Sequence, residues 1–342
     1  MALRTWGGAC QIAAVYIGTI IGAGFATGKE IVQFFSQYGL YGLGGIVVSG
    51  WLFIFLGAKI MLKAVEVRAA SFEEFNSYLF GEKLGLAATF IQFLMLVGVT
   101  GVMLSGTGAL FEERFHIPGN AGIGLTLVIG FLIVRKGMSG LFAVNIFVVP
   151  LMIIFHLYAA GEAAAQPAFL ENLFTRVTEG PVWKLWTSPF SYAAFNLALA
   201  QAVLVPLAFG INDKETIRKG AFLGGAALTC LMLASHISLV QLPNVSEYDI
   251  PMAQIVERLM PAFHFIYAFL IYGEIFTSVV GNVYGLKQQL STHFSWPPSV
   301  LLLLIFSAGF LLSQISYGTL LSLLYPLFGL ISLVFLILLW RK

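Results

Sequence analysis

The stretch Gly18-Thr19-Ile20-Ile21-Gly22-Ala23-Gly24-Phe25-Ala26-Thr27-Gly28-Lys29-Glu30 decides the architecture of this 342-residue chain. It lies in the middle of the first hydrophobic segment, yet it holds four glycines within eleven positions. Each glycine costs about 1 kcal/mol relative to alanine inside a helix. Lys29 and Glu30 follow at a depth where ionisable side chains are expensive. The stretch therefore predicts a helix broken in mid-membrane, where freed backbone groups and charges create a binding site.

The composition is that of an integral membrane protein. Hydrophobic residues make up 59% of the chain and charged residues 10%, with a mean hydropathy of +0.91. Soluble domains contain about 25% charged residues, whereas the apolar runs here have the length of helices that cross a bilayer. The runs are continuous rather than alternating, which argues against a β-barrel. Cys10 and Cys230 lie in or beside apolar runs, which favours two reduced, buried thiols over a disulfide.

Ten apolar runs have the length of membrane spans, and the first and sixth are irregular. They lie at about residues 7–38, 41–65, 84–110, 118–135, 139–161, 185–211, 216–241, 261–289, 297–314 and 317–340. The sixth combines a polar stretch with Pro206, which can kink a helix. Because the irregular spans are five apart, we predict two repeats of opposite topology within one membrane domain. The repeats are residues 1–162 and 185–342, joined by an extracellular linker at 163–184.

Basic residues predict the orientation of the chain. If the N-terminus is inside, 13 of the 18 lysine and arginine residues fall on inner segments and 4 on outer segments, and the last is Lys29. Both termini are therefore predicted to be cytoplasmic, in the plasma membrane of a bacterium. Among Asp, Glu, Lys and Arg side chains, only Lys29, Glu30 and Glu274 lie inside spans away from helix ends.

A broken first span offers a solute both free N–H donors and free carbonyl acceptors. The backbone N–H groups of its outer half, which begins near Ala26, suit a carboxylate. The free carbonyl groups at residues 18–21 suit a cation or an ammonium group. The alternative is helix packing, because the glycines form two small-xxx-small pairs, but packing explains neither Lys29 nor Glu30.

Lys29 lies near the positive end of the outer half-helix, so a partner is expected, either Glu274, Glu30 or a substrate carboxylate. The alternative is that Lys29 extends toward water. Glu30 either contacts the substrate or stabilises the start of its helix. The candidate substrate-binding residues are Gly22, Ala23, Gly24, Phe25, Thr27, Lys29, Glu30, Tyr192, Phe195, Asn196 and Gln201.

Glu274, Thr277 and Ser278 are spaced i, i+3 and i+4, so they share one helix face. A carboxylate beside two hydroxyl groups can bind Na⁺, and it can carry a proton when burial disfavours its charged form. The alternative is a structural Glu274 that forms a hydrogen bond between helices. His156 in the fifth span is a weaker candidate for proton transfer.

The opening stretch also resembles a known family. Residues 18–25 resemble the first-helix signature of the amino acid–polyamine–organocation transporters, and the string through Glu30 resembles the bacterial YkvI group within the LeuT-like superfamily. The resemblance implies an all-α polytopic membrane protein of ten transmembrane helices, with a LeuT-like 5+5 inverted repeat and broken helices 1 and 6. Spans 1, 2, 6 and 7 would form a bundle against a scaffold of the others. Residues 251–260 would form an outer lid helix.

The same resemblance implies a site for a coupling ion. It places carbonyl ligands at Gly18 and Ile21, hydroxyl ligands at Thr277 and Ser278, and a further carbonyl ligand at Glu274. The acidic side chain at position 274 departs from the sodium pattern of the superfamily, so H⁺ and Na⁺ both remain open. Apart from Na⁺ at these residues, no metal or cofactor is predicted.

These observations predict a secondary active transporter that moves a small organic solute, an amino acid or related amine, by alternating access coupled to H⁺ or Na⁺. The alternative is a transport-inactive solute sensor or a channel-like protein on the same fold. An enzyme is not predicted, because the sequence lacks the H-E-x-x-H and G-x-S-x-G motifs and clustered metal ligands. The expected partners are a small-molecule solute and membrane lipid but no nucleic acid, and the oligomeric state is left open.

Overall fold

The computed structural model describes residues 2–175, 182–248 and 250–342. Over these residues the chain is helical and has no β-strand, which confirms the predicted all-α class. The α-helices are α1 (Ala2–Ile20), α2 (Ala23–Ala26), α3 (Lys29–Phe34), α4 (Leu40–Glu66), α5 (Phe72–Phe80), α6 (Glu82–Phe115), α7 (Gly119–Arg135), α8 (Met138–Ala164), α9 (Phe169–Thr175), α10 (Val182–Ile211), α11 (Lys214–Leu239), α12 (Pro251–Leu259), α13 (His264–His293), α14 (Pro298–Ser313) and α15 (Tyr317–Arg341).

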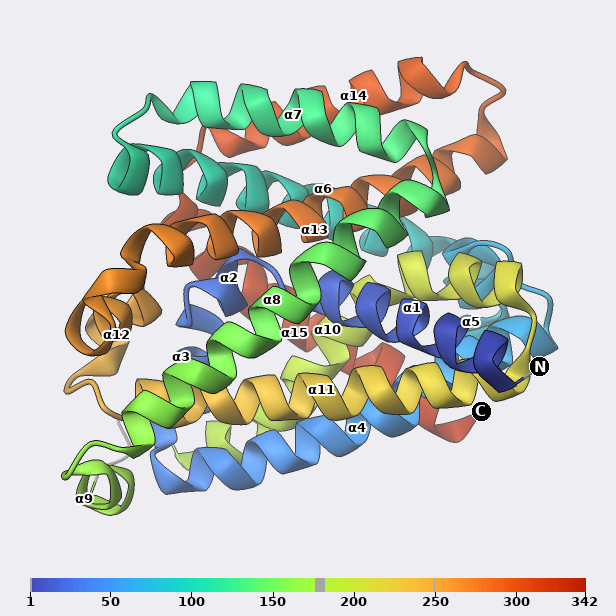
Figure 1. Cartoon of the computed structure of the whole chain (residues 1–342). Helices are drawn as coiled ribbons and strands as arrows, with labels where there is room; N and C mark the ends of the chain where they lie inside the picture. Colours follow the sequence, from blue (N-terminus) through green and yellow to red (C-terminus); the bar gives the residue numbers. More distant parts are fainter. Residues whose placement is uncertain (1, 176–181, 249) are drawn as a thin grey trace.

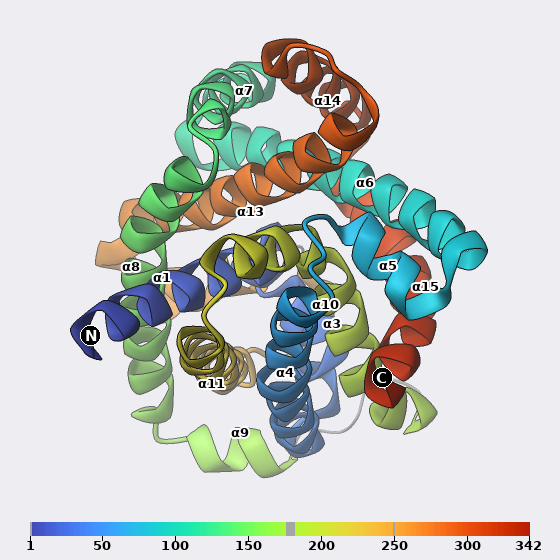
Figure 2. The same ribbon diagram turned by 90° about the vertical axis from the view of Figure 1, so that its right-hand side faces the viewer.

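The long helices form two groups that lie side by side (Figures 1 and 2). In the first group, which we call the bundle, α1, α4, α10 and α11 pack against one another. They correspond to the predicted spans 1, 2, 6 and 7. In the second group, which we call the scaffold, α6 and α13 lie together, and α7 and α14 cover their far side. Helix α8 crosses between the groups and contacts α1, α11 and α13.

Glycines let the helices of the bundle approach closely. A Cβ atom at Gly225 of α11 would lie 2.7–2.8 Å from the Cγ1, Cα and N atoms of Ile54 in α4. Similarly, a Cβ atom at Gly220 would lie 2.6 Å from the Cβ atom of Ile12 in α1. Tyr16 of α1 donates a hydrogen bond of 2.8 Å to the carbonyl oxygen of a residue in α4, Phe53. The bundle is therefore held together at backbone distance.

In the described part of the chain, seven helices are long and apolar enough to cross a membrane, namely α4, α6, α8, α10, α11, α13 and α15. Three shorter apolar helices, Trp6–Ile20, Gly119–Arg135 and Pro298–Ser313, lie at the predicted first, fourth and ninth spans. The count of ten spans and the division into two repeats stay predictions. The predicted linker at 163–184 contains α9, and residues 176–181 of it lie outside the described residues.

The sixth span is not broken, contrary to the prediction, because α10 is one continuous helix. The side-chain nitrogen of Asn196 donates a hydrogen bond of 3.0 Å to the carbonyl oxygen of Tyr192 within the same helix, so it stabilises no break. Pro206 removes the N–H group that would pair with the Ala202 carbonyl. Gly285 of α13 packs directly against that carbonyl. Tight packing on α13 thus supports the helix where the proline weakens it.

Two smaller predictions have different outcomes. Cys10 and Cys230 carry free thiols, as predicted, but both residues are exposed rather than buried. The short helix predicted at 251–260 is confirmed as α12.

A Gly225→Ala variant tests the close packing of α11 on α4. Alanine gains about 1 kcal/mol over glycine in a helix interior. Here its methyl group would meet backbone atoms of Ile54, which cannot rotate away, and overpacking costs about 1–3 kcal/mol. We expect the purified variant to melt about 2–4 °C lower in a thermal unfolding assay.

Gly44→Ala in α4 is the matched control, because a Cβ atom at Gly44 meets nothing within 4 Å. This variant should melt at the wild-type temperature or slightly above it. Equal losses in the two variants would contradict the packing explanation.

Candidate functional site

The first span is interrupted twice near its middle (Figure 1). Helix α1 ends at Ile20, Gly22 is extended with φ −133° and ψ −164°, and the single-turn helix α2 begins at Ala23. A second interruption follows at Gly28, whose φ of +82° is a left-handed conformation that favours glycine. Helix α3 begins at the next residue, Lys29. The predicted break in the first span is confirmed, and the backbone groups around it form the candidate site.

A methionine of the scaffold fills the space beside the first interruption. The N–H group of Ala23, at the N-terminus of α2, donates a hydrogen bond of 3.1 Å to the sulfur atom of Met103 in α6. A Cβ atom at Gly22 would lie 2.8 Å from the terminal carbon of Met103. A thioether is a weak acceptor on a flexible chain. A carboxylate would therefore be a stronger partner for this N–H group than the thioether is.

Oxygen atoms converge at the end of α1, where a cation site is predicted. The hydroxyl group of Ser278 in α13 donates to the carbonyl oxygen of Ile21 and lies 3.5 Å from that of Gly18. The hydroxyl group of Thr277 donates over 2.9 Å to the carbonyl oxygen of Glu274. A Cβ atom at Gly18 would lie 3.5 Å from the Cβ atom of Thr277. The structure thus brings the five predicted ligand residues to one contact between α1 and α13.

Asn145 of α8 lies at the same place and was not among the predicted site residues. Its side-chain nitrogen donates a hydrogen bond of 2.8 Å to the carbonyl oxygen of Leu141. Its side-chain oxygen is buried, has no hydrogen-bond partner among the described residues and contacts Gly18. The sequence shows only a polar residue in an apolar span, and the fold is needed to place it beside α1.

Glu274 and His156 form a second buried polar pair. Their closest atoms, Glu274 Oε1 and His156 Nδ1, are 3.9 Å apart. His156 Nδ1 also lies 3.0 Å from the carbonyl oxygen of Met152, which can only accept, so Nδ1 carries a hydrogen. The other atoms, Glu274 Oε2 and His156 Nε2, have no hydrogen-bond partner within the described chain. The imidazole ring lies 5.7 Å from the ring of Phe25, which places the pair beside α2.

Glu30 lies on another side of α2. Its carboxyl group is buried against Gly24, where a Cβ atom would overlap it. The hydroxyl groups of Tyr192 in α10 and Tyr325 in α15 lie beside this carboxyl group. Phe195 packs against Tyr325 with ring centroids 4.9 Å apart and ring planes tilted by 46°. The structure therefore brings four of the predicted substrate-binding residues together at one position.

Lys29 turns outward, which corrects the prediction that pairs it with Glu30 or Glu274. Its ammonium group donates hydrogen bonds to the carbonyl oxygens of Ser246 at 3.0 Å and Tyr248 at 2.5 Å, in the loop before α12. It also lines a cavity of about 630 Å³ together with Gln33 of α3 and Tyr317 of α15. Side chains of neighbouring residues on a helix point about 100° apart, so those of Lys29 and Glu30 lie in different surroundings.

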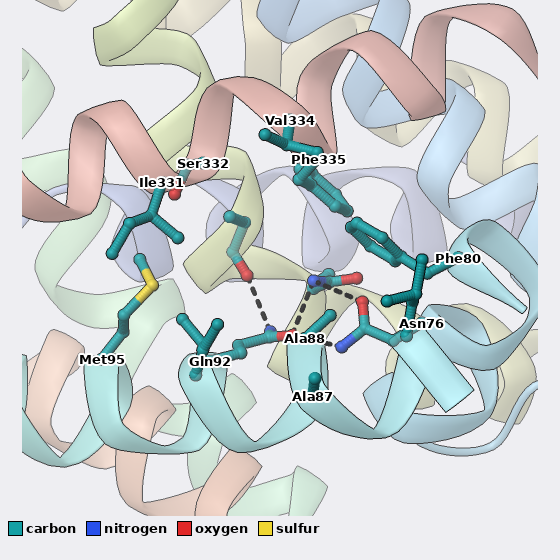
Figure 3. Close-up of a pocket in the computed structure, with 14 residues that line it drawn as sticks. Asn76, Phe80, Ala87, Ala88, Gln92, Met95, Ile331, Ser332, Val334 and Phe335 are labelled. Atoms are coloured by element: carbon teal, nitrogen blue, oxygen red, sulfur yellow. Dashed lines mark hydrogen bonds between the residues drawn. The ribbon is translucent and has the colours of Figure 1, made fainter. Parts of the chain in front are cut away.

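Two more predicted site residues form hydrogen bonds outside the interrupted segment. Asn196 bonds within its own helix, as described above. Gln201 joins a cluster of three carboxamides with Asn76 of α5 and Gln92 of α6 (Figure 3). Both follow Tyr192 on the same continuous helix.

One side of the break is closed by α12. The N–H group of Met252 donates a hydrogen bond of 3.0 Å to the carbonyl oxygen of Thr27. The hydroxyl group of Thr27 lies 3.4 Å from that of Tyr317. On the far side of α12, Glu257 pairs with Arg114 of α6 at 2.7 Å. This helix therefore lies where the predicted lid would be.

Comparison with solved structures identifies this arrangement of helices. The crystal structure of MhsT in complex with L-phenylalanine matches with a TM-score of 0.70 and 15% sequence identity, covering 91% of this chain and 79% of that chain. Mhp1, a nucleobase-cation-symport-1 family transporter with bromovinylhydantoin bound, matches with a TM-score of 0.62 and 13% identity over 92% of this chain and 74% of its own. A manganese transporter of Eremococcus coleocola matches with a TM-score of 0.63 and 12% identity over 88% and 68%.

At these identities the likeness shows the fold alone, and this fold is the LeuT fold of integral membrane transporters. No family model matches the chain. The membrane protein YkvI of Bacillus subtilis (strain 168) is 44% identical over 330 residues, 96% of this chain and 94% of the relative. YyaD of the same strain is 22% identical over 337 residues, 97% and 96% of the two chains. The chain belongs to the YkvI family of membrane proteins.

A Ser278→Ala variant tests the polar contact that closes the end of α1. Without the hydroxyl group, the buried carbonyl oxygen of Ile21 loses its partner, which costs about 1–3 kcal/mol. We expect a clear fall in the melting temperature of the purified protein.

Ser235→Ala in α11 is the matched control. Ser235 is also buried, but its hydroxyl group has no hydrogen-bond partner among the described residues. Its removal should leave the melting temperature unchanged or raise it. An unchanged melting temperature for the Ser278→Ala variant would show that the contact contributes nothing to stability.

Proposed function

We propose that this protein is a secondary active transporter that moves a small organic solute, an amino acid or a related amine, by alternating access. The interrupted first span carries the proposal. It presents the N–H group of Ala23 and the carbonyl oxygens of Gly18 and Ile21 within one short segment. A carboxylate of the solute suits the N–H group, and the two carbonyl oxygens suit a cation. MhsT was solved with L-phenylalanine and Mhp1 with bromovinylhydantoin, so two proteins of this fold bind small organic molecules.

In this proposal the solute displaces the side chain of Met103. The carboxylate of the solute accepts the hydrogen bond that Ala23 now donates to the sulfur atom. Its amine lies toward Glu30, whose carboxyl group is buried between Gly24 and two tyrosine hydroxyl groups. The exchange favours binding because a charged acceptor forms a stronger hydrogen bond than a thioether does.

Two features support ion coupling, each for a different ion. Na⁺ would suit the carbonyl oxygens of Gly18 and Ile21, the hydroxyl group of Ser278 and the unpaired amide oxygen of Asn145, which are all neutral oxygen ligands. H⁺ would suit Glu274, which faces His156 and has one carboxyl oxygen without a hydrogen-bond partner among the described residues.

We further propose that the protein lies in the plasma membrane with both termini cytoplasmic, which places α12 outside. A cysteine introduced at Glu257, in a background without Cys10 and Cys230, should then react with an impermeant thiol reagent on intact cells. Reaction only after permeabilisation would indicate the opposite orientation.

Uptake into proteoliposomes tests transport. Amino acids and amines are first screened for those that raise the melting temperature, because a ligand stabilises the state that binds it. A radiolabelled hit should then accumulate above equilibrium when an ion gradient is imposed. Gly22→Leu should lower the initial rate about tenfold or more, since its side chain competes with the solute for the space of Met103.

Gly161→Leu in α8 is the control, because a Cβ atom there meets nothing within 4 Å. Gly22→Ala, whose Cβ atom would meet the flexible end of Met103 and, at 3.2 Å, the Ser278 hydroxyl oxygen, keeps the test valid if the leucine variant fails to fold. Stabilisation by a ligand without accumulation under any gradient would favour the sensor instead.

The coupling ion is tested with the same vesicles. We expect a proton gradient to drive uptake in sodium-free buffer, because Ser278 already satisfies the Ile21 carbonyl whereas the carboxyl group of Glu274 is only partly satisfied. Glu274→Gln should then abolish accumulation but keep exchange of labelled for unlabelled solute. Uptake that requires Na⁺ and survives Glu274→Gln would refute proton coupling and assign the role to the ligands at Gly18 and Ser278.

A further inference from the structure

A cavity separate from the interrupted span lies between α4 and α11, which Figure 2 shows side by side. Its volume is about 590 Å³, within the range of about 300–1,000 Å³ that is typical of small-molecule sites. It lies toward the end of α4, at Glu66, and the start of α11, at Lys214. In the proposed orientation these helix ends face the cytoplasm. The residues that line the cavity are all distinct from those of the proposed transport site.

Helix α4 contributes a row of side chains that changes from aromatic to basic. Trp51, Phe55, Lys59 and Lys63 line the cavity at intervals of four residues, so they follow one slanted ridge of the helix. The ridge rises about 18 Å from the first of them to the last. Trp51 is 49% exposed and Phe55 is 45% exposed, on a helix long and apolar enough to cross a membrane. The row therefore runs from the lipid-facing surface to the charged end of the helix.

Basic side chains outnumber acidic ones around the cavity, four to one. The acidic side chain, Glu66, pairs with Lys63 at 3.1 Å. The ammonium group of Lys59 donates a hydrogen bond of 2.9 Å to the carbonyl oxygen of Trp340 in α15, a neutral partner that leaves the charge in place. The side chains that line the cavity therefore carry an excess of three positive charges.

The two basic residues of α11 at this cavity have no partner of their own. Lys214 and Arg218 are exposed and form no hydrogen bond, ion pair or ring contact within the described chain. The acidic residues beside them are engaged elsewhere, since Asp213 caps α11 and Glu215 pairs with Lys219 at 2.6 Å. The start of a helix disfavours cations, so Lys214 and Arg218 do not stabilise α11. Their charges are available to an anion from outside the chain.

The charges and the aromatic wall together indicate the chemistry of the ligand. A phosphate group suits both a lysine ammonium group and the planar guanidinium group of arginine. A wall that continues onto the lipid-facing surface suits an acyl chain, which a soluble anion lacks. Orientation of the chain in the membrane requires positive charge on this side, but it requires neither a cavity nor an aromatic wall beside that charge.

We propose that this cavity binds an anionic phospholipid of the leaflet that borders it, which is the cytoplasmic leaflet in the proposed orientation. The phosphate of the head group lies among Lys63, Lys214 and Arg218, and an acyl chain follows α4 past Phe55 to Trp51. Anionic lipids of the cytoplasmic leaflet attract basic segments in this way. The lipid contacts two helices of the bundle and no residue of the solute site, so its binding is a separate property of the protein.

The test titrates the delipidated full-length protein with two lipids and counts the bound molecules by native mass spectrometry. Dioleoylphosphatidylglycerol and dioleoylphosphatidylcholine have the same chains, but only the first carries a net negative charge. We expect the first molecule of phosphatidylglycerol to bind about tenfold more tightly than that of phosphatidylcholine. Glycerol phosphate, which has the phosphate group but no chains, should not displace it. The assay measures no transport, so its outcome is independent of the proposed function.

Charge-neutralising variants locate the site. A double Lys214→Gln and Arg218→Gln variant should bind phosphatidylglycerol about thirtyfold more weakly, which is about 2 kcal/mol for two cations near a membrane surface. Arg218→Gln alone should lose about fivefold, which keeps the test valid if the double variant fails to fold. The matched control is Arg135→Gln with Lys136→Gln, which removes the same charge from two exposed residues at the end of α7, on the same predicted side of the membrane. This control should bind like the wild type. Equal affinity for the two lipids, equal losses in the two double variants, or displacement by glycerol phosphate would overturn the proposal.

Discussion

The structure depends on one constraint, which is that the backbone groups freed by the interrupted first span must find partners inside a membrane. The Ile21 carbonyl is met by Ser278 of α13, and the Ala26 carbonyl is met by Tyr267 of the same helix at 3.1 Å. Other elements meet the remaining groups, with Met103 of α6 at Ala23 and α12 at Thr27. Each of these partners lies outside the bundle, so the break is one of the places where the bundle contacts the rest of the protein.

This attachment differs in kind from the packing inside the bundle. Within the bundle, glycines bring backbones together, as where Gly225 meets main-chain atoms of Ile54. At the break the contacts are single hydrogen bonds and one methionine side chain, which can be exchanged for others at small cost. Contacts at the break that can be exchanged would suit the rocking motion of the proposed transport cycle. The glycines of this chain thus serve two purposes, close packing in α11 and an interrupted backbone in α1.

The features that depend on local sequence could be predicted, and those that depend on distant neighbours could not. The break follows from glycines and charges in an apolar run, and the common face of Glu274, Thr277 and Ser278 follows from helical spacing. The continuity of α10 across Pro206 depends on a glycine of α13 that sequence spacing does not place there. The direction of Lys29 likewise depends on loop carbonyls more than 200 residues further along the chain. The hydrogen bonds from Gln201 to Asn76 and Gln92 could not be predicted for the same reason.

The two candidate coupling ions are not independent, because their sites share α13. Side chains at i, i+3 and i+4 are about 5–6 Å apart on a helix. A cation about 5–6 Å from an ionised carboxylate would be attracted to it by about 3 kcal/mol in a medium of effective dielectric constant 20. If both ions bind as proposed, Na⁺ beside Ser278 and the proton on Glu274 would therefore disfavour each other, because the cation is attracted to the ionised carboxylate.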